Sequence, residues 1–136
     1  MKNKFLSTFF LTCVAFSSAY AENSDIAGQY SCKISRPGSS KQFPGHLVVQ
    51  KVEQAYQFDW QFAKKANFKG TALWDKASGT VAVVSSRVEN PEKISLTTFT
   101  VAANGDLNGQ YVAKDSTEVG LEVCNKDTTA LLPSKK

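Results

Sequence analysis

The chain contains a single histidine, His46, and this limits the catalytic chemistry that its residues allow. A histidine-activated serine would have to use His46, and the sequence has no Gly-x-Ser-x-Gly elbow to present that serine. Zinc sites need several histidine, cysteine or carboxylate ligands. His46 follows Pro44-Gly45 at an expected strand start, so we predict a surface position for it. We predict no enzymatic activity, no metal site and no cofactor.

Carboxylates are the other residues able to transfer protons, and the candidates are Asp59, Asp75, Glu118 and Glu122. They are scattered, and most fall at polar-face positions, which argues against a paired acid–base site. Glu122 is the exception, because it alternates with apolar residues near the C-terminus. If it points inward, it must be paired or hydrogen-bonded. Its expected partner is Arg87, a lysine or a polar group of a ligand; without a ligand, it would simply close one end of a barrel.

Aromatic residues follow a period of two in Tyr56-Gln57-Phe58-Asp59-Trp60-Gln61-Phe62, which places all four rings on one face of a strand. A small barrel is either packed solid by such side chains or encloses one small ligand. Both interpretations stay open here. Trp60 and Trp74 are favoured as pocket residues by their size and polar N–H. The candidate ligand-binding residues are Tyr56, Trp60, Trp74, Tyr111 and Glu122.

The N-terminus has the three parts of a secretory signal peptide. Lys2 and Lys4 supply the positive start, Phe5–Phe16 is largely apolar, and Ala19-Tyr20-Ala21 offers small residues to the peptidase. We predict that residues 1–21 are removed. An uncleaved anchor is the alternative, but a membrane span needs about 20 consecutive apolar residues and this stretch is shorter.

Cleavage changes how the rest of the chain is interpreted. It removes Cys13, whose lipidation would be a further alternative, and two lysines, so the formal net charge falls from +4 to about +2. That balance does not call for nucleic acid as a partner. The remaining Cys32 and Cys124 are expected to form a disulfide in an oxidising compartment, the alternative being two buried thiols. We expect a periplasmic or extracellular protein, with no stable membrane insertion after cleavage.

Eight segments carry strand signals and are separated by turn signals. The predicted strands are Gly28–Ser35, Gly45–Glu53, Ala55–Phe62, Phe68–Asp75, Thr80–Val88, Ile94–Ala102, Asp106–Ala113 and Thr117–Asn125. Predicted turns include Asn90-Pro91, and Asn104-Gly105 favours a type I′ turn in a tight hairpin. No segment has the pattern of an amphipathic helix. The domain is predicted to span residues 22–126, followed by a flexible tail over 127–136.

Short strands joined by short turns predict an all-β fold, an eight-stranded antiparallel up-and-down barrel or a closely related sandwich. In a closed barrel the first and last strands are neighbours, so a Cys32–Cys124 disulfide would clamp the seam. On the last predicted strand, Glu122 and Cys124 lie on one face and the apolar residues Val119, Leu121 and Val123 lie on the other. An inward disulfide would therefore point the apolar face outward. A bulge, an inward Glu122 or a bridge outside the barrel would each reconcile the pattern.

Five short motifs occur in a recognisable order along nearly the whole mature chain. They are Gly28-Gln-Tyr30-Ser-Cys32, Tyr56-Gln-Phe58-Asp-Trp60, Lys69-Gly70-Thr71-Ala72, Asp106-Leu107-Asn108-Gly109-Gln110-Tyr111 and Gly120-Leu-Glu122-Val-Cys124. This pattern resembles small secreted bacterial proteins of lipocalin-like (calycin-type) barrel form, although Tyr30 stands where lipocalins have tryptophan. The Tyr30-Ser-Cys32 opening and the late cysteine also resemble periplasmic lysozyme-inhibitor barrels. The resemblance implies a barrel that binds something, and it transfers no catalytic residue.

The absence of a catalytic constellation and the aromatic-rich pattern lead to one functional expectation. We expect an exported, monomeric, non-enzymatic binding protein with a small apolar ligand in its barrel. The alternative is a protein-interaction module, such as an inhibitor of a secreted host enzyme or a secreted host-interaction factor, that acts through its loops. A pocket beside Trp60 and Trp74 would favour the ligand, whereas a filled interior would favour the loops.

Overall fold

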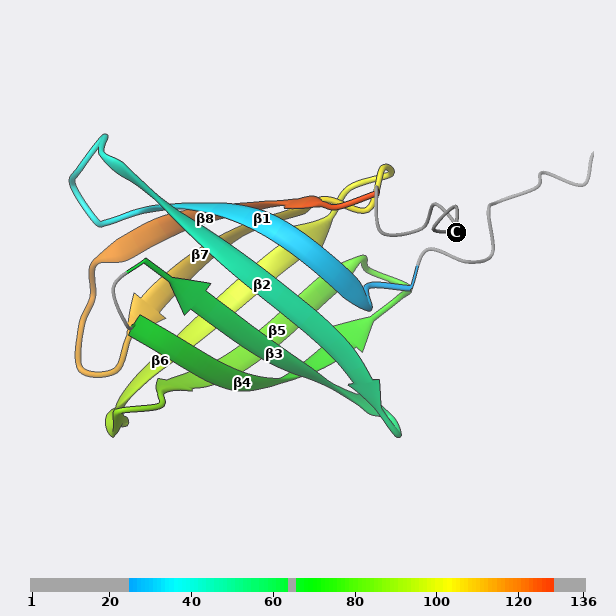
Figure 1. Cartoon of the computed structure of the whole chain (residues 1–136), viewed down its shortest axis with the longest axis horizontal. Helices are drawn as coiled ribbons and strands as arrows, with labels where there is room; N and C mark the ends of the chain where they lie inside the picture. Colours follow the sequence, from blue (N-terminus) through cyan, green and yellow to red (C-terminus); the bar gives the residue numbers. More distant parts are fainter. Residues whose placement is uncertain (1–24, 64–65, 129–136) are drawn as a thin grey trace, which may run out of the picture.

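The computed structural model describes residues 25–63 and 66–128, which form a barrel of eight antiparallel strands (Figure 1). Each strand pairs with the next along the chain, and β1 also pairs with β8, so the sheet closes. No helix occurs among the described residues. This confirms the all-β barrel rather than the sandwich. The strands are β1 (Gly28–Ser35), β2 (Gln42–Val52), β3 (Ala55–Phe62), β4 (Ala66–Asp75), β5 (Thr80–Arg87), β6 (Asn90–Val101), β7 (Leu107–Ala113) and β8 (Val119–Lys126).

The predicted signal peptide, residues 1–21, and the part of the predicted tail from residue 129 onward lie outside the described residues. The last strand ends at Lys126. The N–H of the next residue, Asp127, still donates a 2.8 Å hydrogen bond to the carbonyl of Gln29. The start of the tail is therefore attached to the first strand.

Three strands, β2, β4 and β6, begin earlier than the pattern predicts, and two of them contain a proline near their start. β2 begins at Gln42 and contains Pro44, and β6 begins at Asn90 and contains Pro91. Proline removes one donor from the ladder, which is tolerated best at the beginning of a strand. The predicted turn at Asn90-Pro91 is therefore wrong, because the chain turns one step earlier, at Val88-Glu89.

The hairpin between β6 and β7 is present, but its predicted type I′ turn is wrong. Such a turn needs positive φ at both central residues, and Gly105, at 89°, has positive φ whereas Asn104 does not. The Gly105 N–H donates to the Ala102 carbonyl at 2.9 Å. Asn104 instead uses its side chain, whose Oδ1 accepts from the Asp106 N–H at 3.0 Å. This local hydrogen bond supports a longer loop than the dipeptide alone predicts.

Strand β3 confirms the period of two in the aromatic segment. Tyr56, Phe58 and Trp60 are buried, and the intervening Gln57 and Gln61 are exposed. The buried rings touch: the Phe58 centroid lies 5.3 Å from that of Trp60. Together with the inward residues of the other strands they form the core. Its other members include Tyr30, Leu47, Val49, Ala72, Val81, Val83, Phe99 and Leu107.

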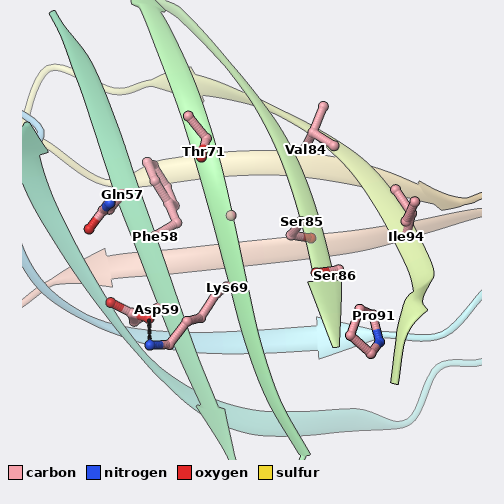
Figure 2. A pocket seen from close by; sticks show the side chains of 11 residues that line it. Gln57, Phe58, Asp59, Lys69, Thr71, Val84, Ser85, Ser86, Pro91 and Ile94 are labelled. Atoms are coloured by element: carbon pink, nitrogen blue, oxygen red, sulfur yellow. Dashed lines mark ion pairs between the residues drawn. The ribbon is translucent and has the colours of Figure 1, made fainter. Parts of the chain in front are cut away.

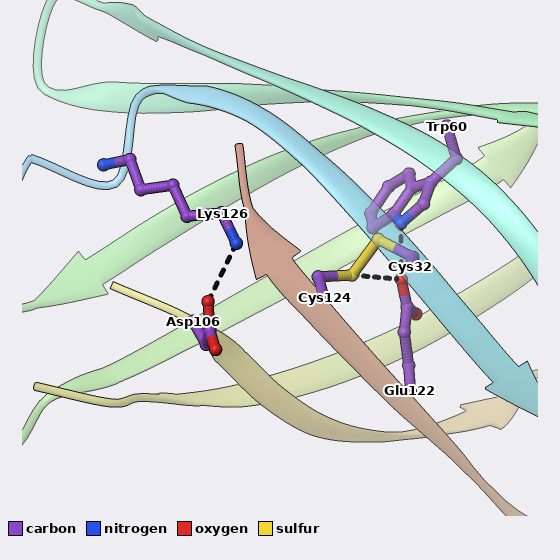
Figure 3. Close-up of a disulfide and its surroundings, with 6 residues drawn as sticks. All are labelled: Cys32, Trp60, Asp106, Glu122, Cys124 and Lys126. Carbon is purple, nitrogen blue, oxygen red and sulfur yellow. Dashed lines mark hydrogen bonds between the residues drawn. A yellow bond between two sulfur atoms is a disulfide. The ribbon is translucent and has the colours of Figure 1, made fainter. Parts of the chain in front are cut away.

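A disulfide between Cys32 and Cys124 joins β1 to β8 at directly paired positions (Figure 3). Both cysteines are buried, so the bridge lies inside the barrel and clamps its seam as predicted. Side chains alternate along a strand, so Glu122 also points inward, and it is only 4% exposed. The pairing of β8 with both neighbours continues without a bulge. The apolar residues of β8 point outward and are 43–58% exposed: Val119, Leu121 and Val123.

The end of the barrel where β1, β3, β5 and β7 begin, on the right in Figure 1, is closed by the segment before β1. Ile26 is buried there, and its carbonyl accepts a 2.6 Å hydrogen bond from the Tyr30 hydroxyl. The Tyr56 hydroxyl donates to Asp25 Oδ1 at 2.9 Å, and Lys126 Nζ donates to the Asp25 carbonyl at 2.6 Å. Three strands thus hold the segment across this end, which we call the closed end.

Candidate functional site

The opposite end of the barrel, which we call the open end, leads into a cavity of about 590 Å³. Cavities that bind small molecules have volumes of about 300–1,000 Å³ and mostly apolar walls. Apolar and aromatic side chains form much of this wall: Ile34, Phe43, Trp60, Phe62 and Phe68. The Phe62 and Phe68 rings meet edge-on, with centroids 5.8 Å apart. The open half of the barrel is therefore hollow.

Glycines paired with aromatic residues help to keep this half hollow. Phe62 lies over its direct cross-strand partner Gly45, where an added Cβ would lie 2.3 Å from the ring. Tyr111 covers its partner Gly120 with the same 2.3 Å spacing. Both rings therefore lie against the wall, in the space that a side chain on the glycine would occupy. The inward positions of β5 and β6 here hold small polar side chains, Ser85 and Thr97.

Glu122 lies at the inner boundary of the cavity, beside the disulfide (Figure 3). The indole Nε1–H of Trp60 donates to its Oε1 at 2.6 Å. The Sγ of Cys124 lies 3.3 Å from the same oxygen, but a disulfide sulfur has no proton to donate. Burial raises the pKa of Glu122 to about 7, against the opposing effect of the Trp60 hydrogen bond. Near neutral pH this carboxyl group can therefore act as an acceptor or, when protonated, as a donor.

Two arginines lie at the open end of the cavity. The guanidinium of Arg36 stacks 4.8 Å from the ring centroid of Phe43. Arg87, the last residue of β5, lies 3.6 Å from the carboxylate of Glu89. Its buried Nε has no hydrogen-bond partner among the described residues. Arg87, one of the alternative partners expected for Glu122, thus pairs with Glu89, and Glu122 accepts its hydrogen bond from the Trp60 indole instead.

The five predicted ligand-binding residues separate into two groups. Trp60, Tyr111 and Glu122 line the cavity. Tyr56 and Trp74 lie toward the closed end, where their rings meet edge-on at 6.1 Å and Tyr56 bonds to Asp25. Burial, followed by the hydrogen bond to Asp25, raises the pKa of Tyr56 to about 12. The pocket expected beside both tryptophans therefore lies beside Trp60 alone.

Residue type alone does not identify several other side chains that line the cavity, among them Arg36, Phe43, Phe68, Ser85 and Thr97. Their common feature is their position along the strands. Antiparallel neighbours reverse direction, so the end of β3 lies beside the start of β4 and the end of β5 beside the start of β6. Inward-pointing residues at the same end of the barrel as Trp60 share its cavity, so their position along the strands predicts these residues. Residue type alone does not predict them.

The remaining candidates for chemistry lie elsewhere. His46 is partly buried within β2, between Ser31 and Gln61 of the neighbouring strands, and not at a strand start as predicted. Asp75 accepts a 2.7 Å hydrogen bond from Ser78 in the turn after β4, which lowers its pKa. Asp59 lies 3.8 Å from Lys69. None of these side chains lines the cavity at the open end.

A second hollow, of about 410 Å³, lies over β3 to β5 beside the start of β6 (Figure 2). The exposed ion pair between Asp59 and Lys69 borders it, and Gln57, Thr71 and Val84 also point outward there. Exposed ion pairs typically contribute about 1 kcal/mol or less. This hollow lacks the buried carboxyl group and the aromatic cluster of the open end.

Potential metal ligands come together at one place among the described residues. Cys32, Glu122 and Cys124 bring one ligand atom each to within 4.8 Å of one another. Zinc binds thiolates, and both sulfurs here belong to the disulfide. The oxidised protein therefore offers only the carboxyl group at this position.

Comparison with known proteins finds no match to a family model and none to a curated protein. The described residues include no helix that could span a membrane. The disulfide is compatible with an oxidising location outside the cytoplasm.

Proposed function

We propose that the chain is an exported, non-enzymatic binding protein that holds a small, mainly apolar ligand at the open end of its barrel. The observation that carries the proposal is the cavity of about 590 Å³, with its aromatic wall and the buried carboxyl group of Glu122. An apolar wall with a few fixed polar groups is typical of sites that bind small molecules. The predicted signal peptide and the buried disulfide support export.

Fluorescence of Trp60 tests this proposal directly. The chain has two tryptophans, and Trp74 has no hydrogen-bond partner for its indole nitrogen among the described residues. Trp74→Phe therefore removes the distant fluorophore without breaking a hydrogen bond. Titration with decanoate and with anilinonaphthalene sulfonate should give saturable changes in Trp60 emission. No saturable change with either probe, confirmed by calorimetry, would reject the proposal.

A matched pair of variants on β6 locates the binding. Thr97 is buried and lines the cavity, so Thr97→Phe fills the space and should abolish the fluorescence change. Thr98, the next residue, lies on the other face of the same strand. Thr98→Phe should bind both probes as the parent protein does. Equal loss in both variants would indicate a general effect on the barrel.

Native mass spectrometry of the protein purified from its producer tests export and occupancy together. The expected mass begins at Glu22 and is lighter by the two hydrogens of one disulfide. A bound small molecule adds a discrete mass that is lost in Thr97→Phe. An intact N-terminus would contradict the predicted cleavage after Ala21.

An apolar row on the outside of the barrel favours a second candidate function, protein interaction. Val84, Leu96, Val112 and Val119 are successive cross-strand partners on β5 to β8. Val84, Leu96 and Val119 are 47–57% exposed. Contiguous exposed apolar side chains mark interaction surfaces. A stoichiometric protein partner that Leu96→Lys releases, but Leu73→Lys retains, would support this function; Leu73 is exposed outside the row.

A further inference from the structure

The cavity has charged groups of opposite sign at different depths. Arg87 ends β5 at the open end, with its side chain one-third exposed, whereas Glu122 is almost completely buried beside the disulfide. On the basis of the proposed function, we propose that the ligand is an amphiphile with two polar groups. Its anionic group binds Arg87, and a hydroxyl or ammonium group at the far end of its apolar body donates to Glu122.

The inner contact follows from the incomplete hydrogen bonding of Glu122. A carboxylate accepts several hydrogen bonds through its two oxygens. Among the described residues only Trp60 donates to this one, and it donates to Oε1. Leaving a buried charge with a single neutral donor is costly. A donor on the ligand supplies the second hydrogen bond, and an ammonium group also neutralises the charge.

The outer contact follows from Arg87. Its Nε–H is buried and has no acceptor among the described residues, although the terminal nitrogen reaches Glu89 outside. Guanidinium groups bind carboxylates and phosphates through paired N–H donors. Arg36 adds a second positive charge to the same cavity. An anionic group at this position satisfies the donor and meets charge of opposite sign.

The middle of the cavity determines the character of the ligand between these two groups. The edge-on pair of Phe62 and Phe68, together with Ile34, presents hydrocarbon rather than hydrogen-bonding groups. Burying an apolar chain here gains about 25 cal/mol for each Å² removed from water. A fully polar ligand, such as a short sugar, would lose this contribution. The inferred ligand is therefore polar at both ends and apolar between them.

A series of straight-chain acids tests the inference. Each acid is titrated into the Trp74→Phe protein beside its ω-hydroxy and ω-amino counterparts. At the chain length that spans the cavity, both counterparts should bind at least about tenfold more tightly than the unmodified acid. Unmodified acids that bind as tightly at every length would overturn the inference and leave the proposed function standing. If neither the acids nor anilinonaphthalene sulfonate bind, the proposed function itself fails.

Two variants assign the contacts to residues. Glu122→Gln keeps an oxygen that accepts from Trp60 but removes the charge, so the advantage of the ω-amino acid should disappear while the unmodified acid still binds. Arg87→Gln should weaken every acid about tenfold and leave the matching alkylamine unchanged. The assignment would be contradicted if the ω-amino acid still bound more tightly than the unmodified acid in Glu122→Gln. It would also be contradicted if Arg87→Gln left the affinity for the acids unchanged. Unfolding curves in urea check that both variants are folded.

The pH dependence of binding provides a signature that a merely structural Glu122 would not give. The pKa of its carboxyl group is raised to about 7, so protonation near neutrality removes the charge. Falling pH should then strengthen binding of the unmodified acid and weaken that of the ω-amino acid. Among residues 25–63 and 66–128, the other charged or titratable side chains that line the cavity are Arg36, Arg87 and Tyr111, and burial raises the pKa of Tyr111. Parallel slopes for the two ligands would reject the direct contact.

Discussion

The two ends of the barrel are made from the same eight strands, but their interiors are filled differently. At the closed end Ile26, just before β1, is buried in the same core cluster as Tyr30 and Leu107. At the open end the rings of Phe62 and Tyr111 lie against glycines, and small polar side chains face the cavity. The closed end therefore contributes stability, and the open end gives up packing to leave room for a ligand. We therefore expect substitutions at the closed end mainly to lower stability and substitutions at the open end mainly to weaken ligand binding.

The largest effect is expected at the disulfide, which lies between the two ends. Replacing both Cys32 and Cys124 by alanine removes a cross-link with a sequence separation of 92 residues. In the chain-entropy model this lowers the free energy of unfolding by about 4–5 kcal/mol. Urea unfolding followed by Trp60 emission measures the loss. A change below about 1 kcal/mol would show that the seam is held by the β1–β8 ladder alone.

The next prediction compares the ends directly. Ile26→Ala at the closed end empties a fully packed position and should cost about 2–5 kcal/mol, while decanoate affinity stays within a factor of about two. Phe68→Ala at the partly exposed wall of the open end should cost about 1–2 kcal/mol and weaken decanoate strongly. Urea unfolding and fluorescence titration of both variants give the two quantities. Equal costs at the two ends would break the comparison.

The buried carboxyl group makes the open end sensitive to pH. The pKa of Glu122 is about 7 in the folded protein against 4.5 for an ordinary glutamate, so the folded state binds the proton more tightly. The contribution of Glu122 to the free energy of unfolding is therefore greatest below about pH 4.5. It decreases as the pH rises through 7, by about 3 kcal/mol in total. Urea unfolding across this window measures the decrease. Glu122→Gln should remove most of this pH dependence of the unfolding free energy. An unchanged dependence in the variant would show that other groups cause it.

The smallest effects are expected from two hydroxyl groups at opposite ends. Tyr56→Phe removes the 2.9 Å bond to the Asp25 carboxylate at the closed end and should cost about 1–2 kcal/mol. Tyr111→Phe removes a 3.2 Å bond to the Ser35 carbonyl at the open end and should cost less than about 1 kcal/mol. Thermal and urea unfolding rank the two variants. The reverse order would show that the Asp25 contact is not what holds the closed end.

The fold followed from the sequence because period-two alternation and turn residues act locally. Local patterns and closure of the sheet were enough to predict three features: the shared face of the four β3 aromatics, the number of strands and the Cys32–Cys124 bond across the seam. The cavity did not follow in the same way. Its existence depends on which inward residue meets which glycine across strands, as Phe62 meets Gly45, and on how deep each side chain lies. Residue type alone therefore grouped Trp74 with Trp60, although the two lie toward opposite ends.

The outward valines of β8 have a consequence for how the chain reaches this structure. Moving a strand by one residue exchanges its two faces. For β8 such a slip would bury Val119, Leu121 and Val123 and expose Glu122, which hydrophobic burial alone would favour. The covalent bond at Cys124 excludes that arrangement, since it holds the cysteine face toward Cys32. Formation of the Cys32–Cys124 bond is therefore compatible with this register of β8 only, and the reduced chain lacks that covalent constraint.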